Sequence, residues 1–159
     1  MAGFSQTPKF ILRLLHWPPK LVYALGLGAW IGNFVLLLTT IGRKSSLARV
    51  TPLQYEIING KIFLGAALGL KTDWVRNILV NPHVEIRIKS RKFTGTAEAI
   101  SDKSLIADFL EVRLKRHPEM MGALLRAEGI PFPPMRSALM QHASELTLIV
   151  ITPDDKLLI

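Results

Sequence analysis

The feature that most constrains this sequence is a run of 22 residues without a charge, which lies between Lys20 and Arg43. A run of this length meets the criterion of about 18 apolar residues for a membrane span. Its pattern changes, however, from helix-like over residues 21–31 to strand-like over residues 34–40, and Gly32 and Asn33 separate the two parts. We therefore interpret the run as a helix, a turn and a buried strand, and not as a membrane span.

The length of 159 residues favours a single domain with one substantial core. We expect this domain to be mainly β with flanking helices. Four parts follow one another along residues 1–159: an N-terminal helix or arm (1–20, with an amphipathic helix over 7–17), a strand-rich core (21–100), a helical segment (101–145) and a closing strand (146–152).

Charge and cysteine content limit the kinds of site and partner that the protein can have. The chain has 20 Lys and Arg residues against 12 Asp and Glu, a formal net charge of +8, and no cysteine. The lack of cysteine excludes a disulfide-stapled module, a cysteine zinc site and a cysteine nucleophile, and it fits a cytoplasmic protein. The positive charge indicates an anionic partner, which composition leaves open between nucleic acid, a lipid surface and a phosphorylated cofactor.

Several familiar site signatures are missing from the sequence. The four histidines have no short-range pairing, so we expect no metal site. The glycines near residue 28 close a helix instead of following a strand, which argues against a dinucleotide fingerprint. Basic residues over 87–92 and 113–116 resemble a nucleic-acid patch, but Phe93 is the only aromatic residue among them, and we expect no nucleic-acid partner. The basic amphipathic N-terminal region offers a peripheral membrane contact.

The middle of the chain has the pattern of antiparallel strands. Strands over 50–58 and 61–67 flank Asn59-Gly60, a strong hairpin signal. Asp73 is placed to cap a short helix that runs to Val80. Two further strands are expected over 83–89 and 92–100, which favours a sandwich or small barrel.

The last third has the pattern of helices followed by one strand. A helix capped by Ser101 is expected to end at His117-Pro118, and a second to cover residues 119–128. Methionines around the proline-rich segment 130–134 suit either an apolar lid over a planar acceptor or simple core packing. Residues 146–152 form the expected closing strand.

The segment Gly42-Arg43-Lys44-Ser45-Ser46 connects two of the expected strands and is the sharpest chemical feature. Two cations, two hydroxyls and exposed backbone N–H groups are able to surround a phosphate. The alternative is a charged turn that only contacts water.

Four motifs in order resemble the deazaflavin-dependent nitroreductase and quinone reductase family, a branch of the flavin-binding split β-barrels. They extend over about residues 21–100, and a strand closing on Thr152-Pro153 is similar too. The motifs are Leu36-Leu37-Leu38-Thr39-Thr40-x-Gly42-Arg43-Lys44-Ser45, Thr51-Pro52-Leu53, Trp74-x-x-Asn77 and Asn81-Pro82-x-Val84.

The resemblance implies an FMN-binding-like split β-barrel and the coenzyme F420, a deazaflavin whose tail carries a phosphodiester and glutamates. It implies no catalytic side chain. The residues that it implies for the coenzyme site are Arg43, Lys44, Ser45 and Ser46 at the phosphate or tail, Thr51 and Pro52 beside the ring, and Ala66, Ala67, Lys71, Trp74 and Asn77 along the rest.

Two positions depart from the family pattern. Members usually have glycine where this chain has Ser46, so a positive φ at this position would strain the serine. A glycine pair is reduced to Gly69 alone. Relatives with the same barrel bind FMN or haem, so the fold does not fix the cofactor.

The function implied by the resemblance is hydride transfer from the reduced deazaflavin to a quinone or nitro-type acceptor. In such a reaction the cofactor supplies the reactivity, and the protein orients it. Two alternatives stay open at this point: an FMN-binding split barrel with another acceptor, and a non-catalytic basic module that binds a membrane surface or nucleic acid.

Overall fold

The structure is a computed structural model that describes residues 34–156 of the chain. The helices expected over 7–17 and 21–31 lie outside the described residues. Within the described range, no helix combines the length and apolar character needed to cross a membrane.

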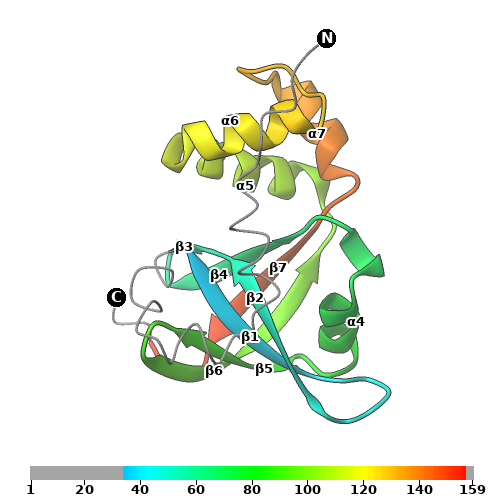
Figure 1. Ribbon diagram of the computed structural model, residues 1–159, viewed down its shortest axis with the longest axis vertical. Helices are drawn as coiled ribbons and strands as arrows, with labels where there is room; N and C mark the ends of the chain where they lie inside the picture. Colours follow the sequence, from blue (N-terminus) through cyan, green and yellow to red (C-terminus); the bar gives the residue numbers. More distant parts are fainter. Residues whose placement is uncertain (1–33, 157–159) are drawn as a thin grey trace.

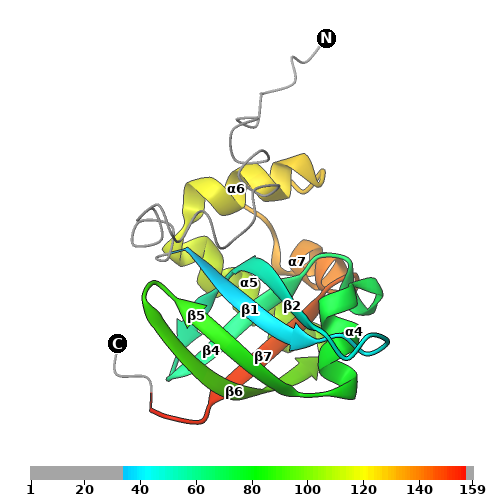
Figure 2. The same ribbon diagram turned by 60° about the horizontal axis from the view of Figure 1, so that its bottom comes forward.

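One seven-stranded antiparallel sheet forms the body of the molecule, in the order β2-β1-β5-β6-β7-β4-β3. The sheet is strongly curled, as Figures 1 and 2 show. Its strands are β1 (Val35–Ile41), β2 (Ala48–Gln54), β3 (Glu56–Ile58), β4 (Lys61–Ala66), β5 (His83–Ile88), β6 (Arg91–Ile100) and β7 (Thr147–Pro153).

The curled sheet is closed by a bend in the chain at Tyr55. The strand expected over 50–58 is in fact two strands, β2 and β3, which lie at opposite edges of the sheet. The Tyr55 N–H donates to the carbonyl of Phe34 at the start of β1, at 3.3 Å, whereas Glu56 already pairs with Phe63 of β4. The single-strand expectation was wrong because this stretch exchanges one strand partner for another at Tyr55.

Helices cover two sides of the barrel. The 3-10 helix η1 (Gly69–Lys71) and α4 (Asp73–Val80) lie against one side, beside the β1–β2 loop. Three helices, α5 (Lys103–Arg116), α6 (Pro118–Ala127) and α7 (Arg136–Ala143), form a helical cap at one end of the molecule (Figure 1).

Strand β7 joins the two cores of the molecule. Its Ile149 and Ile151 side chains pack in the barrel core, whereas Leu148 and Val150 pack in the core of the cap. Alternate residues of a strand point to opposite faces, so both faces of β7 are buried. This explains why the expected closing strand is apolar at four successive positions, Leu148 to Ile151.

Most expected elements are present, with small corrections at their ends. The hairpin at Asn59 and Gly60 is confirmed, and both residues have positive φ, 51° and 74°. Helix α4 has Thr72 and not Asp73 at its N-cap, because the backbone is still extended at Thr72 and already helical at Asp73, whose carboxylate binds Arg43. Helix α5 is capped by Asp102 and not by Ser101, since the Asp102 side chain accepts from the Leu105 N–H at 3.0 Å.

Helix α7 is an element that the sequence pattern did not reveal. It buries only Leu139 and Ala143. Two buried positions are too few to produce a clear helical period over eight residues.

Candidate coenzyme site

The β1–β2 loop, residues 42–47, is a tight turn held by its own hydrogen bonds. The Gly42 N–H donates to the Leu47 carbonyl at 2.8 Å, and the Ser46 N–H donates to the Gly42 carbonyl at 2.8 Å. The Ser45 hydroxyl accepts from the Leu47 N–H at 3.3 Å. A Cβ at Gly42 would lie 2.6 Å from that hydroxyl oxygen and 3.2 Å from the Leu47 carbonyl oxygen, so a larger residue there would displace the Ser45 side chain.

Ser46 has the left-handed backbone that its place in the motif predicts. Its φ is 57°, although it is not glycine. Residues that have a Cβ atom meet a steric penalty in this conformation. The serine therefore introduces local strain into the loop.

Relief of this strain is measurable. We expect Ser46→Gly to raise the free energy of unfolding by about 0.5–1 kcal/mol, because the steric gain outweighs the added freedom of glycine in the unfolded chain. Urea unfolding measures the change. The matched control, Ser45→Gly, should lower stability because it removes the acceptor of the Leu47 N–H. Equal effects of the two variants would contradict the strain at Ser46.

Arg43 and Asn77 lock the loop to helix α4. The Asn77 Oδ1 atom accepts from the Arg43 backbone N–H at 3.1 Å and from Arg43 Nη1 at 3.2 Å. Arg43 Nη2 also forms an ion pair with Asp73 at 2.9 Å. Asn77 is buried, and its Nδ2 atom donates to the hydroxyl of buried Thr40 at 3.2 Å. The Arg43 and Asn77 side chains thus position the loop.

The other expected site residues come from three neighbouring segments. Thr51 and Pro52 are half-buried on β2, opposite Leu38 and Leu37 of β1. Trp74 lies on α4 and packs in the barrel core. The remaining three residues lie between the end of β4 and α4: buried Ala66 is the last residue of β4, exposed Ala67 follows it, and exposed Lys71 ends η1.

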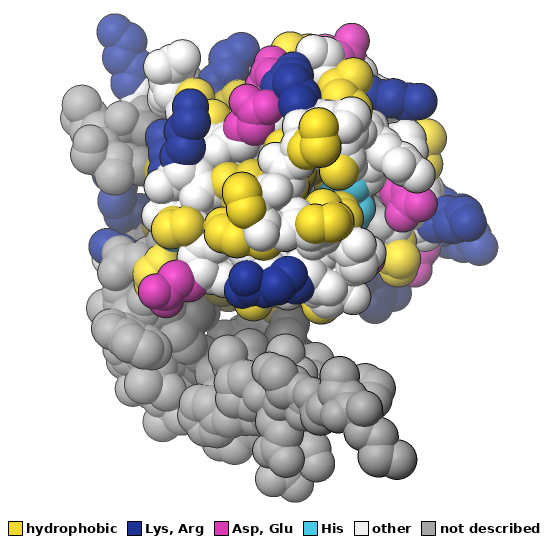
Figure 3. All heavy atoms as spheres, turned by 90° about the horizontal axis from the view of Figure 1, so that it is seen from above, with side chains coloured by type: hydrophobic (Ala, Val, Ile, Leu, Met, Phe, Trp, Pro, Cys, Tyr) yellow, Lys and Arg dark blue, Asp and Glu magenta, His cyan; other side chains and the backbone are white. Residues whose placement is uncertain are grey.

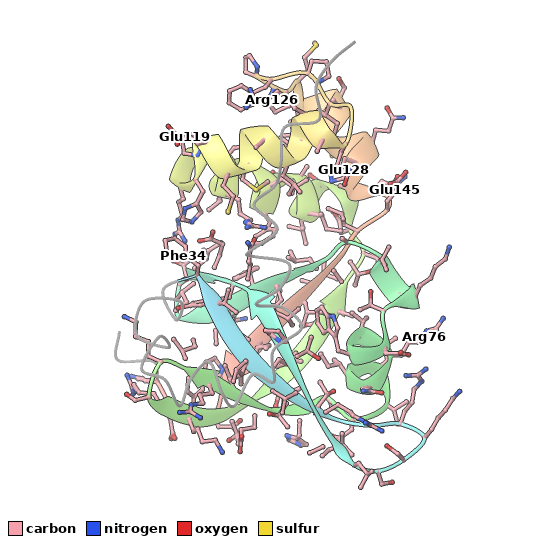
Figure 4. The ribbon with its side chains drawn as sticks, viewed as in Figure 1. Phe34, Arg76, Glu119, Arg126, Glu128 and Glu145 are labelled. Atoms are coloured by element: carbon pink, nitrogen blue, oxygen red, sulfur yellow. The ribbon has the colours of Figure 1, made fainter. Side chains whose placement is uncertain are left out.

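Exposed cations surround the loop and the start of α4. Lys44 and Lys71 are exposed, and Arg49 donates to the Ser45 hydroxyl at 3.4 Å. Arg76 extends outward from α4 (Figure 4) while its Nε atom donates to the Leu70 carbonyl at 3.0 Å. Of these four cations, none forms an ion pair within residues 34–156. The chemistry of this group fits an anionic coenzyme tail.

A second polar cluster, at the boundary of barrel and cap, was not foreseen. The buried Glu56 carboxylate forms an ion pair with Arg116 at 2.9 Å, and it lies 3.0 Å from His117 Nε2 and 3.7 Å from Arg113 Nε. Burial lowers the pKa of Arg113, and the charge of Glu56 opposes this shift. A lone acid in an apolar strand was the available signal, because such a carboxylate requires cationic partners.

The basic residues at the end of α5 therefore have a structural use. Arg113 also donates to the Gln54 side chain at 2.8 Å, and Arg116 donates to the Ile57 carbonyl at 3.0 Å. Both guanidinium groups tie the cap to the barrel. This arrangement explains two of the charges that resembled a nucleic-acid patch in the sequence.

A shallow groove of about 330 Å³ lies on the cap, away from the β1–β2 loop. Phe132, Pro133 and Pro134 line it, together with residues of α5 and α7. Of the methionines nearby, Met121 is fully buried in the cap core and Met135 is 75% exposed. Core packing thus accounts for Met121 and not for Met135.

Comparisons with known proteins place the chain in a family. Three solved structures share the split β-barrel fold. A conserved hypothetical protein of Mycobacterium tuberculosis matches with a TM-score of 0.57 and 15% identity, over 82% of this chain and 80% of that one. The haem storage protein HutZ of Vibrio cholerae matches with a TM-score of 0.53 and 15% identity, over 83% of this chain and 89% of that one. A candidate 5-nitroimidazole antibiotic resistance protein of Bacteroides thetaiotaomicron matches with a TM-score of 0.54 and 11% identity, over 87% of this chain and 81% of that one.

These likenesses confirm the expected fold. The family itself is shown by sequence, because the model of the F420H(2)-dependent quinone reductase family matches residues 24–119, more than half of the chain. The matched segment contains the β1–β2 loop, η1 and α4. This chain belongs to the F420H(2)-dependent quinone reductase family.

Proposed function

We propose that this protein binds the reduced deazaflavin coenzyme F420 and transfers its hydride to a quinone or nitro-type acceptor. The observation that carries the proposal is the rigid β1–β2 loop, which Arg43 and Asn77 hold against α4 inside the family match. The exposed cations Lys44 and Lys71 lie on this loop and just before α4.

The residues divide into those that form the site and those that contact the coenzyme. Arg43 and Asn77 fix the loop, so its conformation exists before the coenzyme arrives. Lys44 and Lys71 attract the anionic tail, and the Ser46 hydroxyl at the tip of the loop donates to it. Thr51 and Pro52 lie beside the ring. The bound coenzyme supplies the hydride, while the protein orients it and keeps water away.

Binding and turnover test this proposal directly. Purified protein is titrated with F420 and, separately, with FMN, and tryptophan fluorescence is recorded. We expect saturable quenching by F420, and oxidation of the reduced coenzyme on addition of menadione or a nitroaromatic compound. Tight FMN binding without F420 binding would move the chain to an FMN-dependent function. Binding of neither, with salt-sensitive retention on DNA or anionic vesicles, would indicate a non-catalytic module.

The cations predict how binding changes on mutation. We expect Lys44→Ala and Lys71→Ala each to raise the Kd for F420 about 3- to 10-fold, as loss of one charge-assisted contact does at an exposed site. The effects should shrink at high salt. The control is Lys61→Ala, an exposed lysine at the opposite end of β4, which should leave Kd unchanged. A control effect equal to that at Lys44 would show that only overall charge matters.

A further inference from the structure

Helix α6 carries apolar side chains on two opposite faces. Its inner face packs into the cap core through Met121, Gly122 and Leu125. The outer face has an exposed apolar stripe, spaced at three- and four-residue intervals and formed by Met120, Ala123, Leu124 and Ala127. A helix that is apolar on both sides normally has a partner on both sides.

The large side chains of the stripe are exposed to a considerable extent for a helix of this length. Met120 is 37% exposed and Leu124 is 47% exposed. Figure 3 looks onto the cap and shows apolar side chains gathered across its face, with side chains of both charges around them. Gln54 of the barrel touches the Met120 end of the stripe, where its Nε2 atom lies 3.9 Å from the Met120 sulfur, and the Leu124 side chain stays largely uncovered within residues 34–156.

The charges beside the stripe are self-complementary. Glu119 and Arg126 are seven residues apart, so they lie on the same flank of α6, two turns from each other (Figure 4). Neither forms an ion pair within residues 34–156. The Arg126 guanidinium lies 5.3 Å from the centre of the Phe132 ring, and this contact holds it beside the stripe.

We propose that the stripe binds the same stripe of a second copy of this chain, with the two α6 helices antiparallel about a two-fold axis near residues 123 and 124. In this arrangement Met120 faces Ala127, and next to the two-fold axis Ala123 meets Ala123 and Leu124 meets Leu124 of the other copy. Antiparallel helices bring like flanks together. Glu119 of each copy then faces Arg126 of the other.

The charge pattern favours a second copy over a lipid surface. Interfacial helices carry Lys and Arg on the polar face and large apolar side chains on the other. Here acids flank the stripe at Glu119 and Glu128, and half of the stripe is alanine. Alanine allows close helix approach but contributes little to insertion into lipid.

The contact is small, which sets the expected affinity. It is confined to one ten-residue helix, below the roughly 800 Å² per partner of a standard interface. We therefore expect a reversible dimer with a Kd on the order of tens of micromolar. This association is independent of coenzyme binding.

Cysteine cross-linking tests the geometry cleanly, because the chain has no cysteine of its own. We expect Ala123→Cys to form a disulfide dimer under mild oxidation. Ala127→Cys alone should not, because its two thiols would lie about 10 Å apart along the helix axes. An equal mixture of the Met120→Cys and Ala127→Cys proteins should form the mixed dimer. Ser137→Cys, exposed on α7, is the control and should stay monomeric.

Sedimentation equilibrium tests the energetics. Leu124→Asp should raise the dimer Kd more than about tenfold. Glu119→Arg and Arg126→Glu should each weaken the dimer, and the double variant should restore it, since the pairs are then reversed but complementary. A monomer at high concentration without an Ala123→Cys cross-link would overturn the proposal, and flotation of that monomer with phosphatidylcholine vesicles would assign the stripe to lipid.

Discussion

Glu56→Gln is expected to lower the free energy of unfolding by about 3 kcal/mol or more. The substitution removes the only acidic partner that Arg113 has within residues 34–156, and Arg113 is largely buried. A buried charge that loses its partner is strongly destabilising, by about 3–5 kcal/mol. Arg116 contributes less to this loss, because 45% of its side chain is exposed and water screens its charge.

Urea unfolding of Glu56→Gln provides the measurement. Glu98→Gln is the matched control, since Glu98 lies exposed on β6 and should change stability by less than about 0.5 kcal/mol. Adding Arg113→Met to Glu56→Gln should recover part of the loss, because the stranded charge is then gone. Simple additivity of these two substitutions would contradict a coupled cluster.

Asn77→Ala is expected to have the second large effect, a loss of about 2–3 kcal/mol together with weaker F420 binding. Asn77 connects buried Thr40 to the Arg43 backbone and guanidinium, and truncation removes the side-chain acceptor of the Arg43 N–H and the donor to the Thr40 hydroxyl, while the guanidinium keeps Asp73. An unsatisfied buried group costs about 1–3 kcal/mol. The loop is then attached to α4 through the exposed Arg43–Asp73 pair alone, so in the proposed complex the coenzyme has to order the loop on binding, which lowers affinity.

The comparison variant for Asn77 is Asn81→Ala. Asn81 lies at the other end of α4 and accepts one hydrogen bond, from the His83 N–H at 3.1 Å. Its loss should cost about 1 kcal/mol and leave coenzyme affinity unchanged. Wild-type F420 affinity in a destabilised Asn77→Ala protein would show that the coenzyme does not contact this loop.

Local signals in the sequence were sufficient where the structure depends on neighbouring residues. The positive φ of Asn59 and Gly60 and the cost at Ser46 follow from turn chemistry alone. The alternation in β5 predicted a buried face, and Val84, Ile86 and Ile88 are buried. The alternation of apolar residues left the fold open between a barrel and a sandwich, and the resemblance to the family motifs favoured the barrel.

Long-range partners could not be predicted. Arg43 meets Asp73 across 30 positions of sequence, and Glu56 meets Arg116 across 60. No local pattern specifies which cation folds onto which acid. The same limit applies to the bend at Tyr55, because it depends on where two distant strands end.

The bend at Tyr55 makes the barrel mechanically cooperative. Residues 48–58 supply both edges of the sheet, so the same short stretch is hydrogen-bonded to β1 on one side and to β4 on the other. If β2 separates from β1, or β3 from β4, the displaced strand pulls on the other edge strand through Tyr55 alone. The β1–β2 loop leads into this stretch, and Glu56 with its cationic partners lies near its end. Local opening at one end is therefore resisted by the contacts at the other, and the barrel opens as one unit.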